Sequence, residues 1–400
     1  MIRIGTAEVD ITPPVNVPMV GYGARKSGSR GTHDPITARA IVFDNGRARV
    51  AWIIADLLGV SLEQSTLIRK LGGEAAGIAE EAIMFSSTHN HGGPDFRPEP
   101  KVEADTDAYR RYHEEQPRLI VECLKSAAAS LTPVEVLYGR AVTDKVQHNR
   151  RYHMADGKVL MDWDKPDPAQ VVWRAPIDPG VQVLVFRNRK GIIAVLAQFA
   201  CHATVMDSGN YLITADWPGA ARRRLAGLLG GDPWVAIAQG CCGDVNPRFP
   251  RDSFEEVETK GRIVAEAALQ AVTRAEPVRG DEVGSVLLPL RLPRKKPGLD
   301  ATPSGEFYEG HVQALRIGDV AIVGLPGEVF CGIGLDIKAH SYFRAAFVGS
   351  YTGDYWPGYI PTASEYAAGG YEVETCAVAI GADAVLVETA RRALEALKGA

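Results

Sequence analysis

Short apolar runs alternate with helical segments along most of this 400-residue chain. The runs that we expect to be strands lie at 40–43, 50–55, 82–85, 181–186, 192–199, 235–238, 283–290 and 320–323. The segments with apolar residues at helical spacing lie at 61–71, 107–130, 217–229, 254–275, 329–342 and 381–397. This alternation predicts an α/β protein in which mixed β-sheets are covered by helices. Since no linker interrupts it, we expect residues 1–400 to form one domain.

The overall composition is that of an ordinary globular protein, with 46% hydrophobic and 23% charged residues. A formal net charge of -5 leaves no global basic surface that would favour nucleic acid as a partner. No apolar stretch approaches the roughly 20 residues that cross a bilayer, and the first residues lack the pattern of a secretory signal. We therefore expect a cytoplasmic protein that binds a small-molecule substrate, with no nucleic-acid or membrane partner.

Two histidines separated by one residue, His89 and His91, follow the expected strand at 82–85 and precede a Gly-Gly-Pro turn. Side chains two apart on a strand point to the same face, so both imidazoles would project together if the extended backbone continues. Neutral imidazole is the most common metal ligand and the usual proton carrier near neutral pH. The pair therefore indicates a metal site or a catalytic site, although two polar residues at a strand end are also typical of a hydrogen-bonded loop.

Two further polar residues follow apolar strands. His202 comes after the run at 192–199, and Glu328 comes after the run at 320–323, in the sequence Pro-Gly-Glu. A single histidine in such a place is more often structural than a ligand, and a carboxylate at a helix start interacts favourably with the helix dipole. Both residue types are also suitable zinc ligands.

Two loop segments carry further polar chemistry. The segment 239–248 brings an acid, an amide and a cation into one turn, as Asp244, Asn246 and Arg248. A turn fixed by Asp and Asn side chains explains this pattern equally well. The segment 359–372 contains three tyrosines, and aromatic loops normally supply contact area.

Long loops rich in glycine, proline and aromatic residues lie at 13–35, 149–179 and 351–370. Ordered loops of this length usually build a site or its lid. The aromatic pair Tyr355 and Trp356 is expected to be exposed and would suit contact with a second copy, so a homo-oligomer is one expectation.

A series of short motifs runs in order from near the N-terminus to about residue 375. They are GTAEVDITP at 5–13, MVGYG at 19–23, THNHGGP at 88–94, HAT at 202–204, ADWPGA at 215–220, GDVNP at 243–247, PGE at 326–328 and the tyrosine segment at 359–372. In this order they resemble the catalytic region of neutral ceramidases, the zinc amidases that split N-acyl sphingosine, and their bacterial relatives. The resemblance implies the layered α/β/β/α fold of that catalytic domain.

Carried over position by position, the resemblance implies a Zn²⁺ cofactor held by four side chains. These ligands are His89, His202, Glu328 and Tyr359. The resemblance makes His91 the catalytic histidine and Tyr371 the donor of a hydrogen bond to the developing oxyanion. Arg150, or the adjacent Arg151, matches the family's substrate-binding arginine.

One position departs from the family pattern. Asn246 stands where ceramidases carry the serine usually assigned as nucleophile, and an amide cannot serve in that role. We also expect the family's C-terminal β-domain and a secretion signal to be absent. We therefore expect the substrate to be an amide or ester of a small, polar, soluble molecule in place of ceramide.

The predicted reaction is hydrolysis by water that zinc activates. His91 would take the proton of the water and return it to the leaving group, while Tyr371 and Asn246 would donate to the oxyanion. The guanidinium of Arg150 suits an anionic group of the substrate. The residues assigned to substrate binding alone are Arg248, Asp244 and Asp216.

Three other interpretations stay open. Cys241 or Cys242, close before Asn246, would be the nucleophile of a thiol enzyme, although their spacing favours packing. The same zinc site would also serve a lactonase, a lyase or a glycoside-cleaving enzyme. The missing serine is also compatible with a catalytically silent binding protein that retains the fold.

Overall fold

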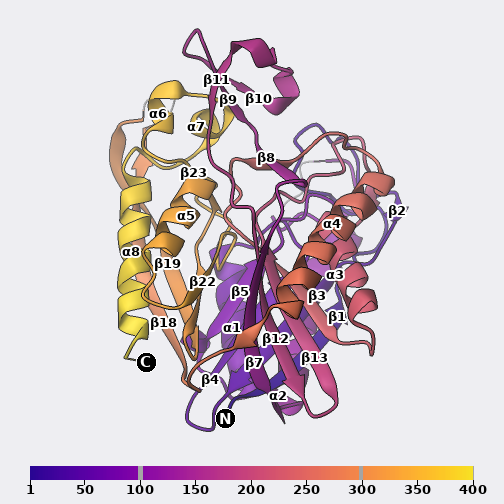
Figure 1. Ribbon diagram of the computed structural model, residues 1–400. Coiled ribbons are helices and arrows are strands. Elements are labelled where there is room, and N and C mark those ends of the chain that lie inside the picture. The colour runs from indigo at the N-terminus through magenta and orange to yellow at the C-terminus, as the bar shows by residue number, and fades with distance from the viewer. Residues whose placement is uncertain (98–101, 297–300, 400) are drawn as a thin grey trace.

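Three β-sheets of four or five strands form the framework of the computed structural model, which describes residues 1–97, 102–296 and 301–399 (Figure 1). The N-terminal sheet has the order β5-β4-β3-β1-β6 and contains β1 (Arg3–Asp10), β3 (Thr37–Asp44), β4 (Arg49–Ala55), β5 (Ile83–Ser87) and β6 (Thr132–Pro133). The central sheet has the order β15-β13-β12-β7-β17 and contains β7 (Glu135–Val142), β12 (Gly180–Asn188), β13 (Gly191–Phe199), β15 (Trp234–Gln239) and β17 (Glu276–Pro277). The C-terminal sheet has the order β18-β19-β20-β22 and contains β18 (Val283–Lys295), β19 (Pro303–Ile317), β20 (Val320–Gly324) and β22 (Ala345–Gly349).

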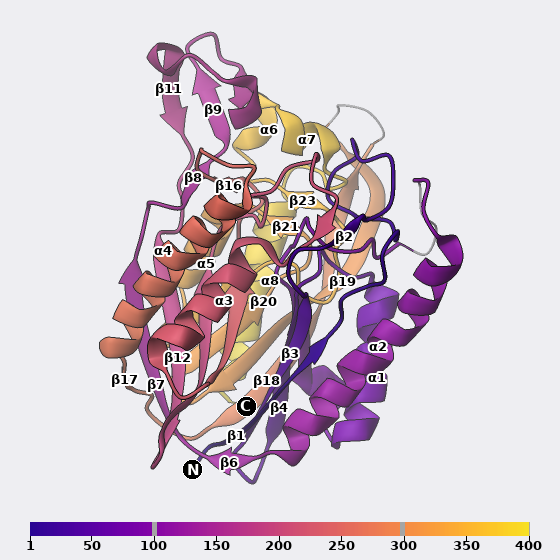
Figure 2. The same cartoon turned by 90° about the vertical axis from the view of Figure 1, so that its right-hand side faces the viewer.

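Each sheet is covered by two helices. The N-terminal sheet carries α1 (Leu62–Ala76) and α2 (Thr106–Ala129), the central sheet carries α3 (Asp216–Leu229) and α4 (Phe254–Thr273), and the C-terminal sheet carries α5 (Cys331–Ala339) and α8 (Ala382–Leu397). Figure 2 shows α3 and α4 on one side, α1 and α2 on the other, and the sheets between them. The predicted mixed sheets and the α/β/β/α layering are therefore confirmed.

The main hydrophobic core joins all three sheets. Phe43 of the first sheet, Phe186 of the second and Phe347 of the third are fully buried in one cluster. Two further clusters fill the space beneath α3 and α4 and beneath α5 and α8. Among the described residues, none of the helices combines the length and the apolarity needed to cross a membrane.

Each of the three sheets contains a parallel strand pair, and this arrangement positions the site. The pairs are β4 with β5, β13 with β15, and β20 with β22. Because parallel strands end at the same edge of a sheet, the loops that leave them emerge together. The chain segments that carry His89, His202 and Glu328 all leave the carboxyl ends of strands in these pairs.

The prediction of a loop at 149–179 is wrong in part, because much of this segment forms a small three-stranded sheet. This appendage has the order β10-β9-β11 and contains β9 (Arg151–Met154), β10 (Val159–Met161) and β11 (Val171–Arg174). It projects at the top of the molecule in Figure 1. The strands of the appendage are only three or four residues long, and the buried residues of β9 are Arg151 and Met154, so a hydrophobic pattern could not reveal it.

Candidate metal centre

His89 and His91 lie just past β5, but not on a continuation of that strand. β5 ends at Ser87, and His89 has φ = 58°, in the left-handed region that few residues other than glycine adopt. The Nε2 atoms of the two imidazoles are nevertheless 3.1 Å apart. The predicted convergence of the two imidazoles is confirmed, but its predicted cause is wrong. The turn at His89 brings the rings together, and a continued strand does not.

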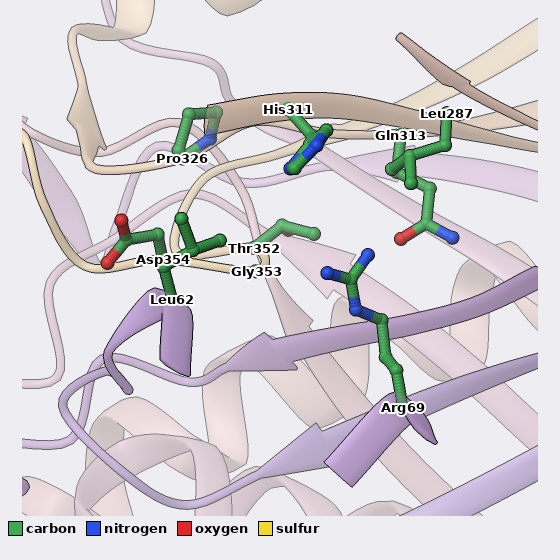
Figure 3. Close-up of a pocket in the computed structure, with 9 residues that line it drawn as sticks. All are labelled: Leu62, Arg69, Leu287, His311, Gln313, Pro326, Thr352, Gly353 and Asp354. Atoms are coloured by element: carbon green, nitrogen blue, oxygen red, sulfur yellow. The ribbon is translucent and has the colours of Figure 1, made fainter. Parts of the chain in front are cut away.

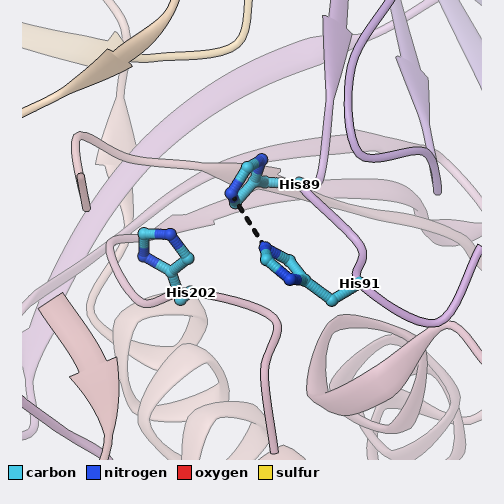
Figure 4. A group of neighbouring side chains, drawn as sticks. All are labelled: His89, His91 and His202. Carbon is cyan, nitrogen blue, oxygen red and sulfur yellow. Dashed lines mark hydrogen bonds between the residues drawn. The ribbon is translucent and has the colours of Figure 1, made fainter. Parts of the chain in front are cut away.

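His202 and Glu328 complete a buried cluster with this pair. The Oε2 atom of Glu328 lies 3.1 Å from Nε2 of His202 and 3.2 Å from Nε2 of His89. One ring nitrogen from each of the three histidines lies within 4.8 Å of the other two, and Figure 4 shows the three imidazoles facing a common point. We call His89, His91, His202 and Glu328 the histidine cluster.

Backbone carbonyls orient two of the three imidazoles. The Nδ1 atom of His89 lies 3.0 Å from the carbonyl of Leu58, and Nδ1 of His202 lies 2.6 Å from that of Cys242. Since a carbonyl only accepts, Nδ1 carries the proton in the neutral form of both rings, which would leave the Nε2 atoms that face the cluster free to hold a metal ion. This is the usual outer arrangement of histidine ligands of metals.

His91 is held differently. Its Nδ1 atom is buried and has no hydrogen-bond partner among the described residues. Gly21 lies against this atom so closely that a Cβ at that position would come within 2.4 Å of it. Within the described part of the chain no carbonyl fixes the tautomer of His91, which distinguishes it from the other two histidines.

The charge states of the cluster suit a divalent metal. Burial lowers the pKa of His91 well below its ordinary value and, helped by Arg150, lowers the pKa of His202 to about 4. Burial opposes ionisation of Glu328, but His89 and His202 hold the pKa of its carboxyl well below the usual range. Neutral imidazoles beside one carboxylate are donors that fit a zinc ion, so the histidines form a possible metal site.

Tyr359 adjoins Glu328 through the backbone. The short strands β21 (Glu328–Val329) and β23 (Tyr359–Ile360) pair in parallel, with Glu328 opposite Tyr359. Burial and the nearby Glu328 carboxylate raise the pKa of Tyr359 well above its ordinary value. The ring of Tyr371, at the start of α7 (Tyr371–Thr375), lies 5.7 Å from the ring of Tyr359. The structure therefore brings both predicted tyrosines beside the cluster.

The two candidate arginines have different partners. Arg150 donates from Nε to Glu372 at 2.6 Å and from Nη1 to the Oδ1 atom of Asn246 at 3.1 Å. Arg151 donates from Nη1 to Glu372 at 2.6 Å and from Nε to Glu365 at 2.9 Å. Of the two arginines, only Arg150 therefore contacts Asn246, the position that departs from the family pattern. Arg151, at the start of β9, binds the segment 365–372.

The amide of Asn246, in β16 (Val245–Pro247), is held from both ends. Its oxygen accepts from Arg150, and its Nδ2 donates to the Oδ2 atom of Asp162 at 3.0 Å. Asp162 is buried in the appendage and was missed by the sequence analysis, because it lies in a stretch expected to be a loop.

The three residues assigned to substrate binding alone make no hydrogen bond with the cluster among the described residues. Asp244 accepts from the backbone N–H of Cys331 at 2.7 Å and from the side chain of Asn149 at 2.6 Å. Asp216 accepts from three backbone N–H groups, and Arg248 is exposed and donates to a backbone carbonyl. Their substrate contacts stay predictions.

Tyr355 contributes to the cluster, which the sequence did not suggest. Its hydroxyl donates to the Oε1 atom of Glu328 at 2.9 Å. The prediction that Tyr355 and Trp356 are both exposed is therefore half wrong, because only Trp356, with 54% of its surface exposed, faces solvent.

The cysteines of the 239–248 turn are poor candidates for a nucleophile. Cys241 and Cys242 are buried, and Sγ of Cys242 lies 3.2 Å from the hydroxyl of Tyr351. Burial raises the pKa of the Cys242 thiol well above its usual value and that of Cys241 to about 12, which disfavours the reactive thiolate.

A cavity of ≈ 480 Å³ borders the cluster. It is lined by Met19, Val20, Gly21, Tyr22, Gly23, Arg25, Lys26, Leu58, Asp95, Phe96, Arg97, Val102, Glu103, Tyr355 and Trp356. Gly21, Leu58 and Tyr355 contact His91, His89 and Glu328 respectively, so they form its shared wall.

Figure 3 shows a much smaller cavity of ≈ 10 Å³, between α1 and the C-terminal sheet. It is lined by Leu62, Arg69, Leu287, His311, Gln313, Pro326, Thr352, Gly353 and Asp354. Its volume is that of one water molecule, so it is too small for a substrate.

Residues 2–286 match the family model described as neutral/alkaline non-lysosomal ceramidase, N-terminal. The chain belongs to this family. The resemblance inferred from the ordered motifs is thereby confirmed for the larger part of this ceramidase-family chain.

Individual ceramidases are similar over part of their length. The neutral ceramidase of Mycobacterium tuberculosis is 24% identical over 319 residues, which cover 70% of this chain and 47% of that protein. The neutral ceramidase of Drosophila melanogaster is 26% identical over 227 residues, which cover 55% of this chain and 31% of that protein. The chain thus spans less than half the length of these relatives.

The crystal structure of the Pseudomonas aeruginosa neutral ceramidase has a similar fold. The TM-score is 0.79 at 20% sequence identity, and the match covers 99% of this chain and 75% of that one. A ceramidase complexed with C2 matches with a TM-score of 0.80 at the same identity. This ceramidase-family chain therefore has the same fold as these two structures.

Proposed function

We propose that this chain is a zinc-dependent hydrolase that cleaves an amide or ester bond of a small soluble molecule. The observation that carries the proposal is the convergence of His89, His202 and the Glu328 carboxylate on one buried point. Catalytic zinc is most often held by three protein ligands of these types. Membership in a ceramidase family supports an amide as the bond that is cleaved, because a ceramidase is an amide hydrolase.

Four side chains would hold the metal in this proposal: His89, His202, Glu328 and Tyr359. A bound zinc ion supplies Lewis acidity, which polarises a carbonyl oxygen and lowers the pKa of water. The fit rests on the two imidazoles oriented by backbone carbonyls and on the ladder that sets Tyr359 opposite Glu328.

His91 would be the general base. Burial keeps its imidazole neutral, so it can accept a proton, and its Nε2 atom faces the cluster. A base of this kind accepts the proton of the attacking water and returns it to the leaving group. The absence of a carbonyl on its Nδ1, in the described part of the chain, supports a mobile proton at this ring.

Water is the proposed nucleophile because Asn246 has no nucleophilic oxygen and its amide is already bound at both ends. Tyr371, whose ring is 42% exposed beside Tyr359, would donate to the developing oxyanion. The adjoining cavity of ≈ 480 Å³ has the size of a small-molecule pocket and would receive the larger part of the substrate.

Metal analysis combined with two substitutions tests the proposal. Protein purified without chelator should contain about one zinc per chain and should hydrolyse members of an N-acyl amide and ester panel. His89→Ala should lose the metal and the activity. His91→Ala should keep the metal and lose about 10²-fold or more in kcat.

The proposal fails if the purified protein holds well under one zinc and added zinc neither binds nor raises the melting temperature. Turnover of lactones or glycosides alone, measured in the same panel, would replace the amide hydrolase with one of the other enzyme classes.

A further inference from the structure

Arg25 is a buried arginine whose guanidinium binds only backbone carbonyls among the described residues. It is 2% exposed. Its Nη1 atom donates at 2.7 Å to the carbonyl of His91 and at 2.7 Å to that of Val20, and its Nε atom donates at 3.1 Å to that of Asn210. Because a buried charge is costly even when it is hydrogen-bonded, a guanidinium in this place indicates a role beyond packing.

One nitrogen of Arg25 joins two chain segments that meet at the His91 ring. Val20 precedes Gly21, where a Cβ would come within 2.4 Å of Nδ1 of His91. The backbone of His91 is held at both ends, since its N–H donates to the carbonyl of Ala203 at 3.3 Å and its carbonyl accepts from Arg25. The guanidinium therefore fixes the backbone of His91 relative to the glycine that closes the space behind its ring.

Tyr22 completes the surface against which His91 packs. The two ring centres lie 5.0 Å apart, and the Tyr22 hydroxyl donates to the carbonyl of Met206 at 2.8 Å. The Cζ atom of Arg25 lies 4.9 Å from the centre of the Tyr22 ring, a distance at which a guanidinium and an aromatic face attract each other. We call Gly21, Tyr22 and Arg25 the His91 wall.

We propose that Arg25 is a positioning residue that keeps the His91 imidazole directed at the other members of the histidine cluster. The inference rests on the proposed function, in which His91 is the general base. His91 needs this support because no carbonyl holds its Nδ1 in the described part of the chain, whereas carbonyls hold the rings of His89 and His202. A base acts only within hydrogen-bond reach of its proton, and a misplacement of about 1 Å costs about 10²-fold in rate.

Binding of an anionic substrate group is the alternative role for Arg25, because this residue also lines the cavity of ≈ 480 Å³. Its hydrogen bonds favour positioning. Nε and Nη1 already donate to carbonyls at 3.1 Å or less, and only Nη2, with a contact of 3.5 Å to the carbonyl of Asp207, has capacity left. The two roles differ in whether a substitution changes kcat or KM.

Substitution of Arg25 tests the proposal by kinetics. Arg25→Met removes the guanidinium and keeps a long side chain, and kcat on an amide or ester substrate should fall about 10- to 100-fold, with KM changed less than about three-fold. Zinc content should equal that of the wild type. Arg25→Lys, which keeps the charge and fewer donors, should recover part of the loss. Arg30→Met replaces an exposed arginine that lies over Tyr211 and, as the matched control, should behave as the wild type.

A double-mutant cycle separates positioning of His91 from a general loss of structure. If Arg25 acts through His91, Arg25→Met should cost less than about two-fold in the His91→Ala protein, whose residual turnover no longer uses the imidazole. A substitution that only loosened the fold would lower turnover equally in both backgrounds.

Imidazole NMR of protein labelled with ¹⁵N-histidine gives a readout that does not need turnover. The His91 signals are assigned by their absence from the His91→Ala spectrum, and spectra are recorded at one fixed pH with and without added zinc. We expect one sharp set of His91 signals in the wild type and in Arg30→Met, and broadened or doubled signals in Arg25→Met. If Arg25→Met does not fold, Tyr22→Leu, which removes the ring from the same wall, is measured in its place and should show the same broadening.

The inference is overturned if the His91 signals are unchanged in the variant, if kcat falls equally in both backgrounds, or if KM rises about ten-fold while kcat is unchanged. The last result would make Arg25 a substrate-binding residue. Loss of zinc from folded Arg25→Met protein would also overturn it, because the wall would then support the metal ligands and not the base alone. If the wild type turns over none of the amides and esters, the hydrolase proposal fails, and the NMR spectra still decide whether Arg25 holds the His91 ring.

Discussion

The histidine cluster and the side-chain network of Arg150, Asn246 and Asp162, which we call the Asn246 network, adjoin each other but are held in different ways. In the cluster, backbone carbonyls of Leu58 and Cys242 orient His89 and His202, and a backbone ladder places Glu328. In the network, side chains orient other side chains, with Arg150 between Glu372 and Asn246. The cluster is therefore part of the sheet framework, whereas the network depends on an appendage and on ion pairs.

This difference determines which changes each region tolerates. Groups held by the main chain keep their positions when neighbouring side chains change, so a metal site is well placed there. Groups held by other side chains can be exchanged together, so such a network can be altered for a different substrate while the cluster is retained.

We expect the largest loss of stability when Glu372, which holds Arg150 in place, is replaced. Glu372 is fully buried and accepts from both Arg150 and Arg151 at 2.6 Å. Glu372→Gln leaves one buried guanidinium without a carboxylate, and we expect the free energy of unfolding in urea to fall by about 3 to 5 kcal/mol. The exposed neighbour change Glu374→Gln should alter it by less than about 0.5 kcal/mol.

The comparison also requires that folded Glu372→Gln protein binds zinc as the unmodified chain does. A loss of zinc affinity measured well below the unfolding transition would show that the two regions are one unit.

A smaller effect concerns Asp244, which accepts from the side chain of Asn149, next to Arg150, and from the N–H of Cys331, three residues after Glu328. Burial raises the pKa of Asp244 to about 6, so between about pH 4 and pH 6 the folded chain keeps a proton that the unfolded chain releases. The free energy of unfolding should therefore fall by about 2 to 3 kcal/mol as the pH rises through this window.

Asp244→Asn removes this titration, so the difference in unfolding free energy between the wild type and the variant should change between pH 4 and pH 7. The exposed Asp232→Asn variant should follow the wild type at every pH. Parallel profiles for Asp244→Asn and the wild type would refute a raised pKa at this carboxyl.

We expect the smallest change for Tyr355, which contacts the histidine cluster through Glu328. Tyr355 donates to Oε1 of Glu328, which leaves Oε2 facing the histidines. Tyr355→Phe should weaken zinc binding about ten-fold, as the loss of an outer hydrogen bond to a ligand usually does. Competition with a chromophoric chelator measures this change.

Tyr351→Phe is the matched control for Tyr355→Phe. It keeps the ring that stacks on His89 at 4.0 Å and removes only the hydroxyl beside Cys242. Equal zinc affinities for the two variants would contradict a positioning role for Tyr355.

Much of the fold could be predicted from the sequence because most central strands are continuous apolar runs. The runs at 192–199 and 320–323, for example, became β13 and β20 with nearly the expected bounds. The strands β1, β7, β19 and β22 were missed. β1, β7 and β19 are interrupted by glycine and charged residues whose burial depends on sheet neighbours.

The site was predictable where polar residues directly follow apolar strands. His89, His91, His202 and Glu328 were all named on this ground, and the structure brings them together. Tyr355 and Asp162 were not named, because their contacts arise from loops whose geometry has no sequence pattern. The left-handed backbone at His89 was equally unpredictable, since it depends on how β5 meets its neighbours.

The two-residue ladder between β21 and β23 has a consequence for how the site assembles. It closes the long loop between Glu328 and Tyr359 by backbone hydrogen bonds, in which no ion takes part. The chain entropy lost in closing that loop is therefore part of folding and does not reduce the affinity for an ion. Because the ladder keeps Glu328 and Tyr359 adjacent, a metal ion would bind two pre-organised side chains, as it binds a chelator.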